Sequence, residues 1–179
     1  AAGVGTRVVS TVGPVLIVGT GLVGASLGLA LRAGGVSVYL KDASPTSLRL
    51  AADVGAGRPL SDVANEARVA CADRGHNHPG YEAPRIVVVA TPPDVADRVI
   101  VDALARFPRA IVTDVASVKD AIVADVLAAL DREGRGEDAS RYVGCHPMAG
   151  RERSGAGAAD ADLFYGRPWV IVAHGRTAP

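Results

Sequence analysis

The chain has 179 residues, of which 49% are hydrophobic and 21% are charged, and its 19 lysines and arginines balance its 19 aspartates and glutamates. This composition is typical of a soluble globular domain, and a chain of this length buries about 70% of the surface that it exposes when unfolded. The balanced charge argues against nucleic acid or an anionic membrane as the main partner, because phosphate-binding proteins usually carry a basic excess.

The start of the chain and its cysteines bear on location. Residues 1–13 contain one basic residue and no long apolar segment, so we interpret them as a leader or a disordered terminus rather than a signal peptide. Cys71 and Cys145 are too few for a disulfide framework, which favours a reducing, cytoplasmic setting.

The stretch from Pro14 to Asp42 predicts a strand, a tight glycine turn, a helix and a second strand. The apolar run Val15–Val18 comes first, the second strand Val36–Leu40 ends at Asp42, and between them lie Gly19, Thr20, Gly21, Leu22, Val23 and Gly24. In dinucleotide-binding folds such a turn brings a pyrophosphate to the helix N-terminus, and an acid about 20 residues later binds the adenosine ribose. We therefore expect these turn residues and Asp42 to bind NAD. NADP is less favoured, because Asp42 would repel a 2′-phosphate.

A membrane helix is the alternative for this stretch. The segment from Val15 to Leu31 is uncharged, and Gly24 and Gly28 have the small-residue spacing of packed membrane helices. The segment is shorter than the ~20 residues that a span needs, and its glycines would weaken a free helix. We predict no membrane partner.

The next segment predicts one helix and then a long loop. Ser44 as the cap and Pro45 at the first position begin a helix over Thr46–Val54 that ends at Gly55. Residues 56–83 predict a weak strand and a loop-rich surface stretch. Three potential metal ligands lie in this stretch: Cys71, His76 and His78. A fourth ligand at the usual spacing is absent, so no metal is predicted.

The strand Arg85–Ala90 has the β-branched run of a strand buried on both faces. Thr91 and Pro92 follow it, and ligands of open α/β sheets bind beyond the carboxyl ends of strands, so we expect both to contact the cofactor. The alternative is a plain turn into the helix Val95–Arg106 with Asp94 as its cap.

Two further strands end in polar residues. Ser117 lies between a strand at Ala110–Thr113 and a helix at Val118–Leu130, either as a helix cap or as a ligand-facing group. The strand Val143–Cys145 leaves His146 at its carboxyl end, and histidine is the commonest general acid or base. A short helix near residues 159–164 and a strand at Pro168–Ala173 complete the chain. The alternation predicts an α/β fold with a doubly wound, mostly parallel, Rossmann-like sheet, in which residues 14–179 form one dinucleotide-binding domain.

Three segments together resemble the prephenate and arogenate dehydrogenases of tyrosine biosynthesis: GTGLVGAS from Gly19, VTDVASVK from Val112 and CHPMAGRERSG from Cys145. The resemblance implies NAD-dependent oxidative decarboxylation of prephenate or arogenate. It implies that His146 accepts the proton of the ring hydroxyl, that Ser117 orients His146 or the substrate, and that Glu152 lies at the pocket entrance. Arg151 stands in the same substrate-binding segment, where relatives commonly carry a small hydroxyl residue.

The resemblance also implies a larger protein. Relatives continue into a helical domain that builds a homodimer and supplies an arginine for the substrate carboxylate, whereas this sequence stops at Pro179. We therefore expect the chain to bind cofactor and to turn over poorly alone.

Two other functions stay open: another NAD-dependent dehydrogenase of the same architecture, and a non-enzymatic NAD-sensing domain. A serine hydrolase built from Ser117 and His146 is disfavoured, because Ser117 lacks a nucleophile-elbow sequence.

Overall fold

The computed structural model describes residues 13–64, 82–150, 152 and 155–178. The expectations for residues 1–12 and for Cys71, His76 and His78 concern residues outside this part of the chain.

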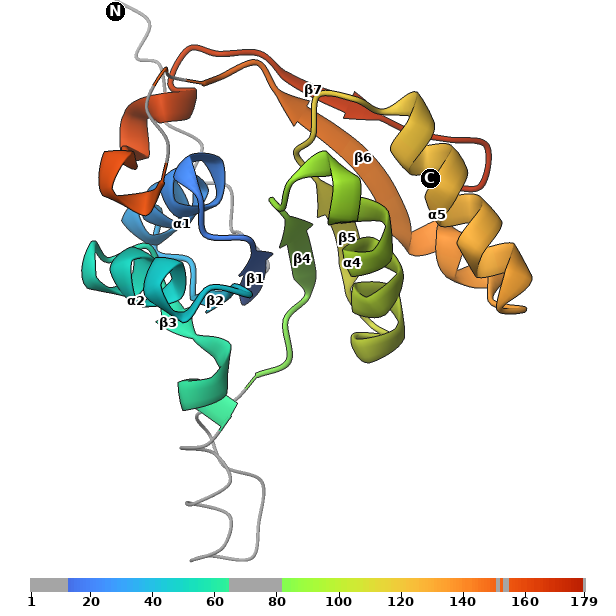
Figure 1. Cartoon of the computed structure of the whole chain (residues 1–179), viewed down its shortest axis with the longest axis horizontal. Coiled ribbons are helices and arrows are strands. Elements are labelled where there is room, and N and C mark those ends of the chain that lie inside the picture. The colour runs from blue at the N-terminus through green and yellow to red at the C-terminus, as the bar shows by residue number, and fades with distance from the viewer. Residues whose placement is uncertain (1–12, 65–81, 151, 153–154, 179) are drawn as a thin grey trace, which may run out of the picture.

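The fold is built on one sheet with the strand order β3-β2-β1-β4-β5-β6-β7 (Figure 1). Neighbouring strands are parallel except for β6 and β7, which are antiparallel. The strands in the described residues are β1 (Val15–Val18), β2 (Val38–Lys41), β3 (Arg58–Pro59), β4 (Ile86–Val89), β5 (Ile111–Asp114), β6 (Tyr142–Pro147) and β7 (Trp169–Val172). The predicted doubly wound, mostly parallel sheet is confirmed.

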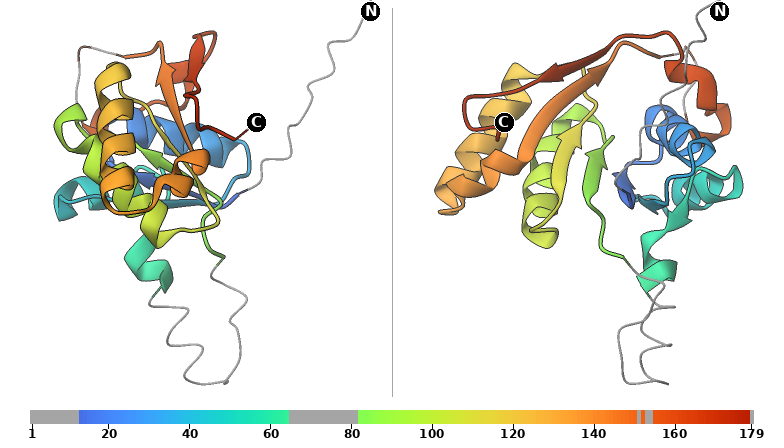
Figure 2. Two further views of the ribbon diagram at one scale, coloured as in Figure 1. Left: turned by 90° about the vertical axis from the view of Figure 1, so that its right-hand side faces the viewer. Right: turned by 180° about the vertical axis from the view of Figure 1, so that it is seen from behind.

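Helices cover both faces of this sheet, and the alternation of each strand divides the core into two. The helices α1 (Leu22–Ala33) and α2 (Pro45–Asp53) lie together on one side, and α4 (Pro93–Arg106) and α5 (Asp120–Arg132) on the other (Figures 1 and 2). Val15 and Ile17 pack in the cluster with α1 and α2, whereas Leu16 packs in the cluster with α4 and α5. Burial on both faces explains why β1 and β4 read as continuous apolar runs.

The last part of the chain returns to the first helix. After β6 the chain reaches two short 3₁₀ helices, η2 (Ala156–Ala158) and η3 (Ala161–Phe164), which lie beside α1 before β7 runs back along β6 (Figures 1 and 2). The backbone N–H of Asp160 donates a hydrogen bond of 3.0 Å to the buried hydroxyl of Ser26. This segment therefore fastens the β6–β7 end of the sheet to its β1 end.

Several predicted boundaries were wrong. The weak strand predicted within residues 56–83 is confirmed as β3, which pairs with β2, but part of the predicted loop is regular, because residues 60–64 are helical with Val63 buried. The helix predicted near 159–164 is the pair η2 and η3, and β6 continues through His146 and Pro147 instead of ending at Cys145. A third 3₁₀ helix, η1 (Gly136–Arg141), precedes β6.

The segment Val15–Leu31, for which a membrane helix was the alternative, contains β1, the glycine turn and most of α1. Within the described ranges, no helix combines the length and the apolar character that crossing a bilayer requires. Gly28 instead packs against the sheet-side turn after α2, where an added Cβ would overlap the carbonyl oxygen of Ala56.

Candidate functional site

The glycine turn lies where the winding of the sheet reverses. β1 pairs with β2 on one side and with β4 on the other, so the crossover connections leave in opposite directions from this point. In open α/β sheets ligands bind at the carboxyl ends of the strands at such a switch point. The turn after β1 and the turn after β4 therefore form the two sides of the expected cofactor site.

Two glycines of the turn are required by geometry. Gly19 has a φ of +99°, and a Cβ there would lie 2.5 Å from the carbonyl oxygen of Ala90. At Gly24 a Cβ would overlap the carbonyl oxygen of Gly19 and lie 3.2 Å from Cγ2 of Ile17. The first turn of α1 can therefore lie directly against the end of β1. By contrast, no described atom lies within 4 Å of the Cβ position of Gly21, which faces open space.

The start of α1 fits an anionic group. Its N-cap residue, Gly21, provides no side-chain cap, and no acidic residue lies in the first turn. The first N–H groups of a helix lack intrahelical partners, so those of Leu22 and Val23 are available to a pyrophosphate placed over Gly21.

Asp42 lies one residue beyond β2 and is held against the glycine turn. Its Oδ2 accepts hydrogen bonds from the backbone N–H of Thr20 at 2.6 Å and from the Thr20 hydroxyl at 2.7 Å. Its Oδ1 accepts one from the N–H of Ser44 at 2.8 Å. The acid predicted to bind the ribose is thus fixed in position, and the sequence pattern did not indicate that Thr20 would hold it.

A cleft of about 810 Å³ joins these groups. It is lined by the turn after β1, the end of β2, the turn after β4 and one face of α4, including Gly19, Gly21, Val23, Asp42, Thr91 and Pro92. Four further polar residues also line it: Lys41, Ser47, Arg98 and Asp102. Arg98 and Asp102 lie one helical turn apart on the same face of α4, one to three turns after Pro92. This spacing is the sequence signal that could have identified both residues.

Thr91 has a buried polar group that the fold leaves free. Its Oγ1 finds no hydrogen-bond partner among the described residues, although it is buried at the cleft wall. Buried hydroxyls are normally paired, so this atom suits a polar ligand group. The assignment of Asp94 as the cap of α4 was wrong, because Pro92 is the N-cap and no side-chain hydrogen bond caps the helix; the contact of Thr91 and Pro92 with the cofactor stays a prediction.

Ser117 lies in the loop between β5 and α5, which a buried carboxylate shapes. Asp114 is fully buried and forms an ion pair with Lys119, and it accepts hydrogen bonds from the Ala116 N–H at 2.9 Å and the Tyr142 hydroxyl at 2.8 Å. Burial, reinforced by the charge of Asp114, raises the pKa of Tyr142, so this hydroxyl stays protonated and donates. The helix begins at Asp120 with Lys119 as its N-cap, so the interpretation of Ser117 as a cap was wrong, and its side chain is exposed.

His146 follows the last paired position of β5 and β6. Asp114, the last residue of β5, pairs with Gly144, and His146 lies two residues further along β6, toward the carboxyl end of β5. Its Nδ1 is buried and has no hydrogen-bond partner in the part of the chain that the structure describes. Because β1, β4, β5 and β6 are parallel, the glycine turn, Thr91, Ser117 and His146 belong to the same carboxyl edge of the sheet, but neither Ser117 nor His146 lines the cleft.

The remaining predicted site residues lie after β6. Glu152 is exposed between β6 and η2, and Arg151 is outside the described residues. No group of three or more metal-ligating side chains occurs within the described ranges.

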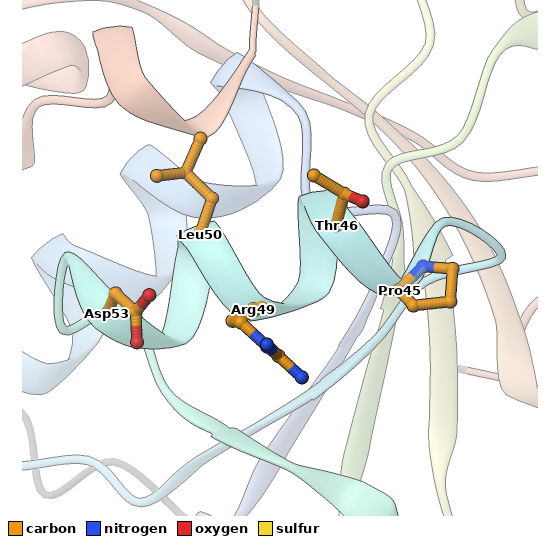
Figure 3. Close-up of a pocket in the computed structure, with 5 residues that line it drawn as sticks. All are labelled: Pro45, Thr46, Arg49, Leu50 and Asp53. Carbon is orange, nitrogen blue, oxygen red and sulfur yellow. The ribbon is translucent and has the colours of Figure 1, made fainter.

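A second hollow, of about 440 Å³, lies on the outer surface of α2. Figure 3 shows its five lining residues, with Leu50 directed toward the segment that carries η2 and Arg49 directed away from it; the five are Pro45, Thr46, Arg49, Leu50 and Asp53. It shares none of the groups of the carboxyl edge, so we assign it no part in the site.

Comparison with known proteins gives concordant matches. The family described as the prephenate dehydrogenase nucleotide-binding domain matches residues 27–178. The probable prephenate dehydrogenase NovF of Streptomyces niveus is 40% identical over 157 residues, which cover 88% of this chain and 37% of that protein.

Two solved structures are similar over most of the chain. Prephenate dehydrogenase from Aquifex aeolicus, in complex with hydroxyphenyl propionate and NAD⁺, aligns with a TM-score of 0.69 and 27% identity over 91% of this chain and 51% of that one. The arogenate dehydrogenase of Synechocystis aligns with a TM-score of 0.71 and 26% identity over 92% of this chain and 51% of that one. The chain thus spans about half the length of these solved relatives and 37% of the curated one.

Proposed function

We propose that this chain, which belongs to the prephenate dehydrogenase family, is the cofactor-binding part of an NAD-dependent dehydrogenase of prephenate or arogenate. The family membership rests on the match to the nucleotide-binding domain. When bound, the nicotinamide would accept a hydride from the carbon that bears the ring hydroxyl, while the ring carboxylate leaves as carbon dioxide and the ring becomes aromatic. The observation that carries the proposal is the presence of His146 at the same carboxyl edge as the glycine turn and Thr91.

The chain's own residues have separate roles in this proposal. His146 accepts the proton of the ring hydroxyl. Its Nδ1 has no hydrogen-bond partner among the described residues, so this nitrogen is available to a ligand or to a positioning group. Such general-base assistance is worth ~10²–10⁴ in rate. Ser117, which is exposed, orients His146 or the substrate. The family resemblance assigns Glu152 to the pocket entrance and Arg151 to substrate binding.

The proposal includes finer features that follow from the family. Asp42 selects NAD over NADP by its charge, and residues 14–179 act as one dinucleotide-binding domain. The reaction belongs to tyrosine biosynthesis, takes place in the cytoplasm and is performed by a homodimer. Light scattering on the protein at the length of its relatives tests the dimer directly.

The experiment that tests the function has a binding stage and a turnover stage. NAD and NADP are titrated into the chain by calorimetry, and NADH formation with prephenate and with arogenate is then measured on a protein that carries this chain at the length of its relatives. His146→Asn is expected to keep NAD affinity and to lose ~10²-fold or more of the rate. The matched control is His174→Asn, since the ring of His174 packs against Tyr142 at the other end of β6 and His174 does not line the cleft.

Each result separates the alternatives. Turnover that disappears in His146→Asn and persists in His174→Asn supports the dehydrogenase. NAD binding without turnover on either substrate would favour another dehydrogenase or an NAD sensor. Absence of NAD binding would contradict the proposal at its first step.

A further inference from the structure

Thr20 is a buried residue whose N–H and hydroxyl groups both donate hydrogen bonds to the carboxylate of Asp42. Its side chain is fully buried, and both its N–H and its hydroxyl donate to Oδ2 of Asp42, at 2.6 and 2.7 Å. Hydrogen bonds from a neutral donor to a carboxylate are among the stronger ones in proteins. Thr20 thus fixes the Asp42 carboxylate from inside the protein, on the side away from solvent.

The hydrogen bonds at Asp42 leave it with little spare capacity. An ionised carboxylate offers about four lone-pair sites. The two on Oδ2 are taken by Thr20, and one on Oδ1 is taken by the N–H of Ser44 at 2.8 Å. Asp42 is partly exposed and lines the cleft, so one acceptor position, on Oδ1, remains for a ligand.

We propose that Thr20 is a positioning residue that determines cofactor specificity by holding Asp42 with this one acceptor position toward the adenosine ribose. The inference rests on the proposed NAD binding. An acceptor fixed in this way matches one ribose hydroxyl and places a full negative charge where a 2′-phosphate would have to lie.

The surrounding residues explain why the orientation of Asp42 matters. Lys41, Ser47 and Arg98 line the same cleft and are all hydrogen-bond donors. If the Asp42 carboxylate were free to turn away from the ribose, these donors could bind a 2′-phosphate, although Lys41 also lies 4.0 Å from the carboxylate of Asp102. The Thr20 hydroxyl opposes this rotation together with the N–H groups of Thr20 and Ser44, and it is the one of the three that a side-chain substitution removes.

The test compares Thr20→Val with two matched variants. Thr20→Val keeps the shape and removes the hydroxyl, Thr20→Ser keeps the hydroxyl, and Thr113→Val makes the same change at a buried threonine outside the cleft. The dissociation constants of NAD and NADP are measured for each by calorimetry, with thermal unfolding to verify the fold.

In Thr20→Val we expect the NAD dissociation constant to rise about tenfold and the preference for NAD over NADP to fall by roughly fivefold or more. Thr20→Ser and Thr113→Val are expected to keep the wild-type preference. The same preference in Thr20→Val as in the wild type would overturn the inference, and so would a lost preference in Thr20→Ser. If Thr20→Val does not fold, Thr20→Ala replaces it in the comparison with Thr20→Ser. A wild-type chain that binds neither dinucleotide would instead contradict the proposed function.

Discussion

At the scale of single residues, two glycines of the turn after β1 have different roles, one in the stability of the fold and one in cofactor binding. A methyl group at Gly24 would overlap the carbonyl oxygen of Gly19, whereas a methyl group at Gly21 would enter open space. We expect Gly24→Ala to lower the free energy of unfolding by about 1–3 kcal/mol, as overpacking does. Gly21→Ala should leave it within about 0.5 kcal/mol and weaken NAD binding about tenfold, because the methyl group occupies the pyrophosphate position.

Urea unfolding and NAD titration of the two variants check this pair. Equal destabilisation by both substitutions would contradict the assigned difference between the two glycines.

His174 is a second residue with a measurable signature. Its ring stacks on Tyr142 with centroids 5.6 Å apart, and its Nδ1 accepts a hydrogen bond from the N–H of Arg176 at 3.2 Å. Burial, assisted by the charge of Arg176, lowers the pKa of His174 below its usual value. The unfolded chain therefore binds a proton more readily than the folded one, and stability falls as the pH drops from about 6.5 toward the lowered pKa.

Urea midpoints at about pH 7.5 and about pH 5.5 measure this loss. We expect a smaller decrease in His174→Gln than in the wild type, because the variant has no imidazole to protonate at that position. An identical decrease in both proteins would show that His174 does not contribute.

At the scale of elements, the buried carboxylate of Asp114 joins β5, β6 and the loop that carries Ser117. It pairs with Lys119, whose side chain is 9% exposed, and accepts from Tyr142. Removing one partner of a buried ion pair leaves an uncompensated charge, so we expect Lys119→Met to cost about 3–5 kcal/mol of unfolding free energy.

The control is Arg176→Met, which removes an ion pair to Asp131 that is exposed and screened by water, and it should cost far less. Adding Asp114→Asn to Lys119→Met should restore part of the lost stability in denaturant unfolding. A double variant less stable than Lys119→Met alone would contradict the role of the unpaired charge.

The same network explains which elements the sequence predicted and which it did not. β1 and β4 were predicted because strands buried on both faces are continuous apolar runs, and Ser44 was predicted as a cap that indeed accepts from the N–H of Ser47 at 3.2 Å. The start of α5 was placed too early, because Asp114 binds the N–H of Ala116 and the side chain of Lys119, which holds the loop open to Asp120. Asp114 is itself held by burial and by the hydroxyl of Tyr142 on β6, and such a tertiary contact leaves no local pattern.

At the scale of the whole molecule, some features of the site were predicted from the sequence and others depend on contacts made only in the folded chain. The glycine turn and Asp42 were predicted from spacing within one βαβ unit, and Thr91 and His146 from their positions after strands. The hydrogen bonds from Thr20 to Asp42 depend on how β1 and β2 pair within that unit, and the cleft face of α4 with Arg98 depends on how separate units pack. A sequence pattern describes each unit, and only the assembled sheet brings the units to one edge.

The cleft also predicts how the whole molecule responds to its cofactor. Its walls come from the β1–β2 part of the sheet, through Gly19 and Asp42, and from the β4–α4 part, through Thr91 and Arg98. A ligand that binds only the folded chain stabilises it by about 2.7 kcal/mol at a concentration of 100 times its dissociation constant. For a domain of this size that corresponds to a rise of roughly 5–11 °C in the unfolding midpoint.

Scanning calorimetry with NAD at that concentration measures the shift. Adenosine monophosphate and nicotinamide mononucleotide serve as half-ligands, each of which contacts part of the cleft. Because NAD joins both parts of the sheet through one molecule, its shift should exceed that of either half-ligand at the same concentration. A midpoint that stays unchanged with NAD would mean that the dinucleotide does not bind the folded chain, and the cleft between β1 and β4 would then need another ligand.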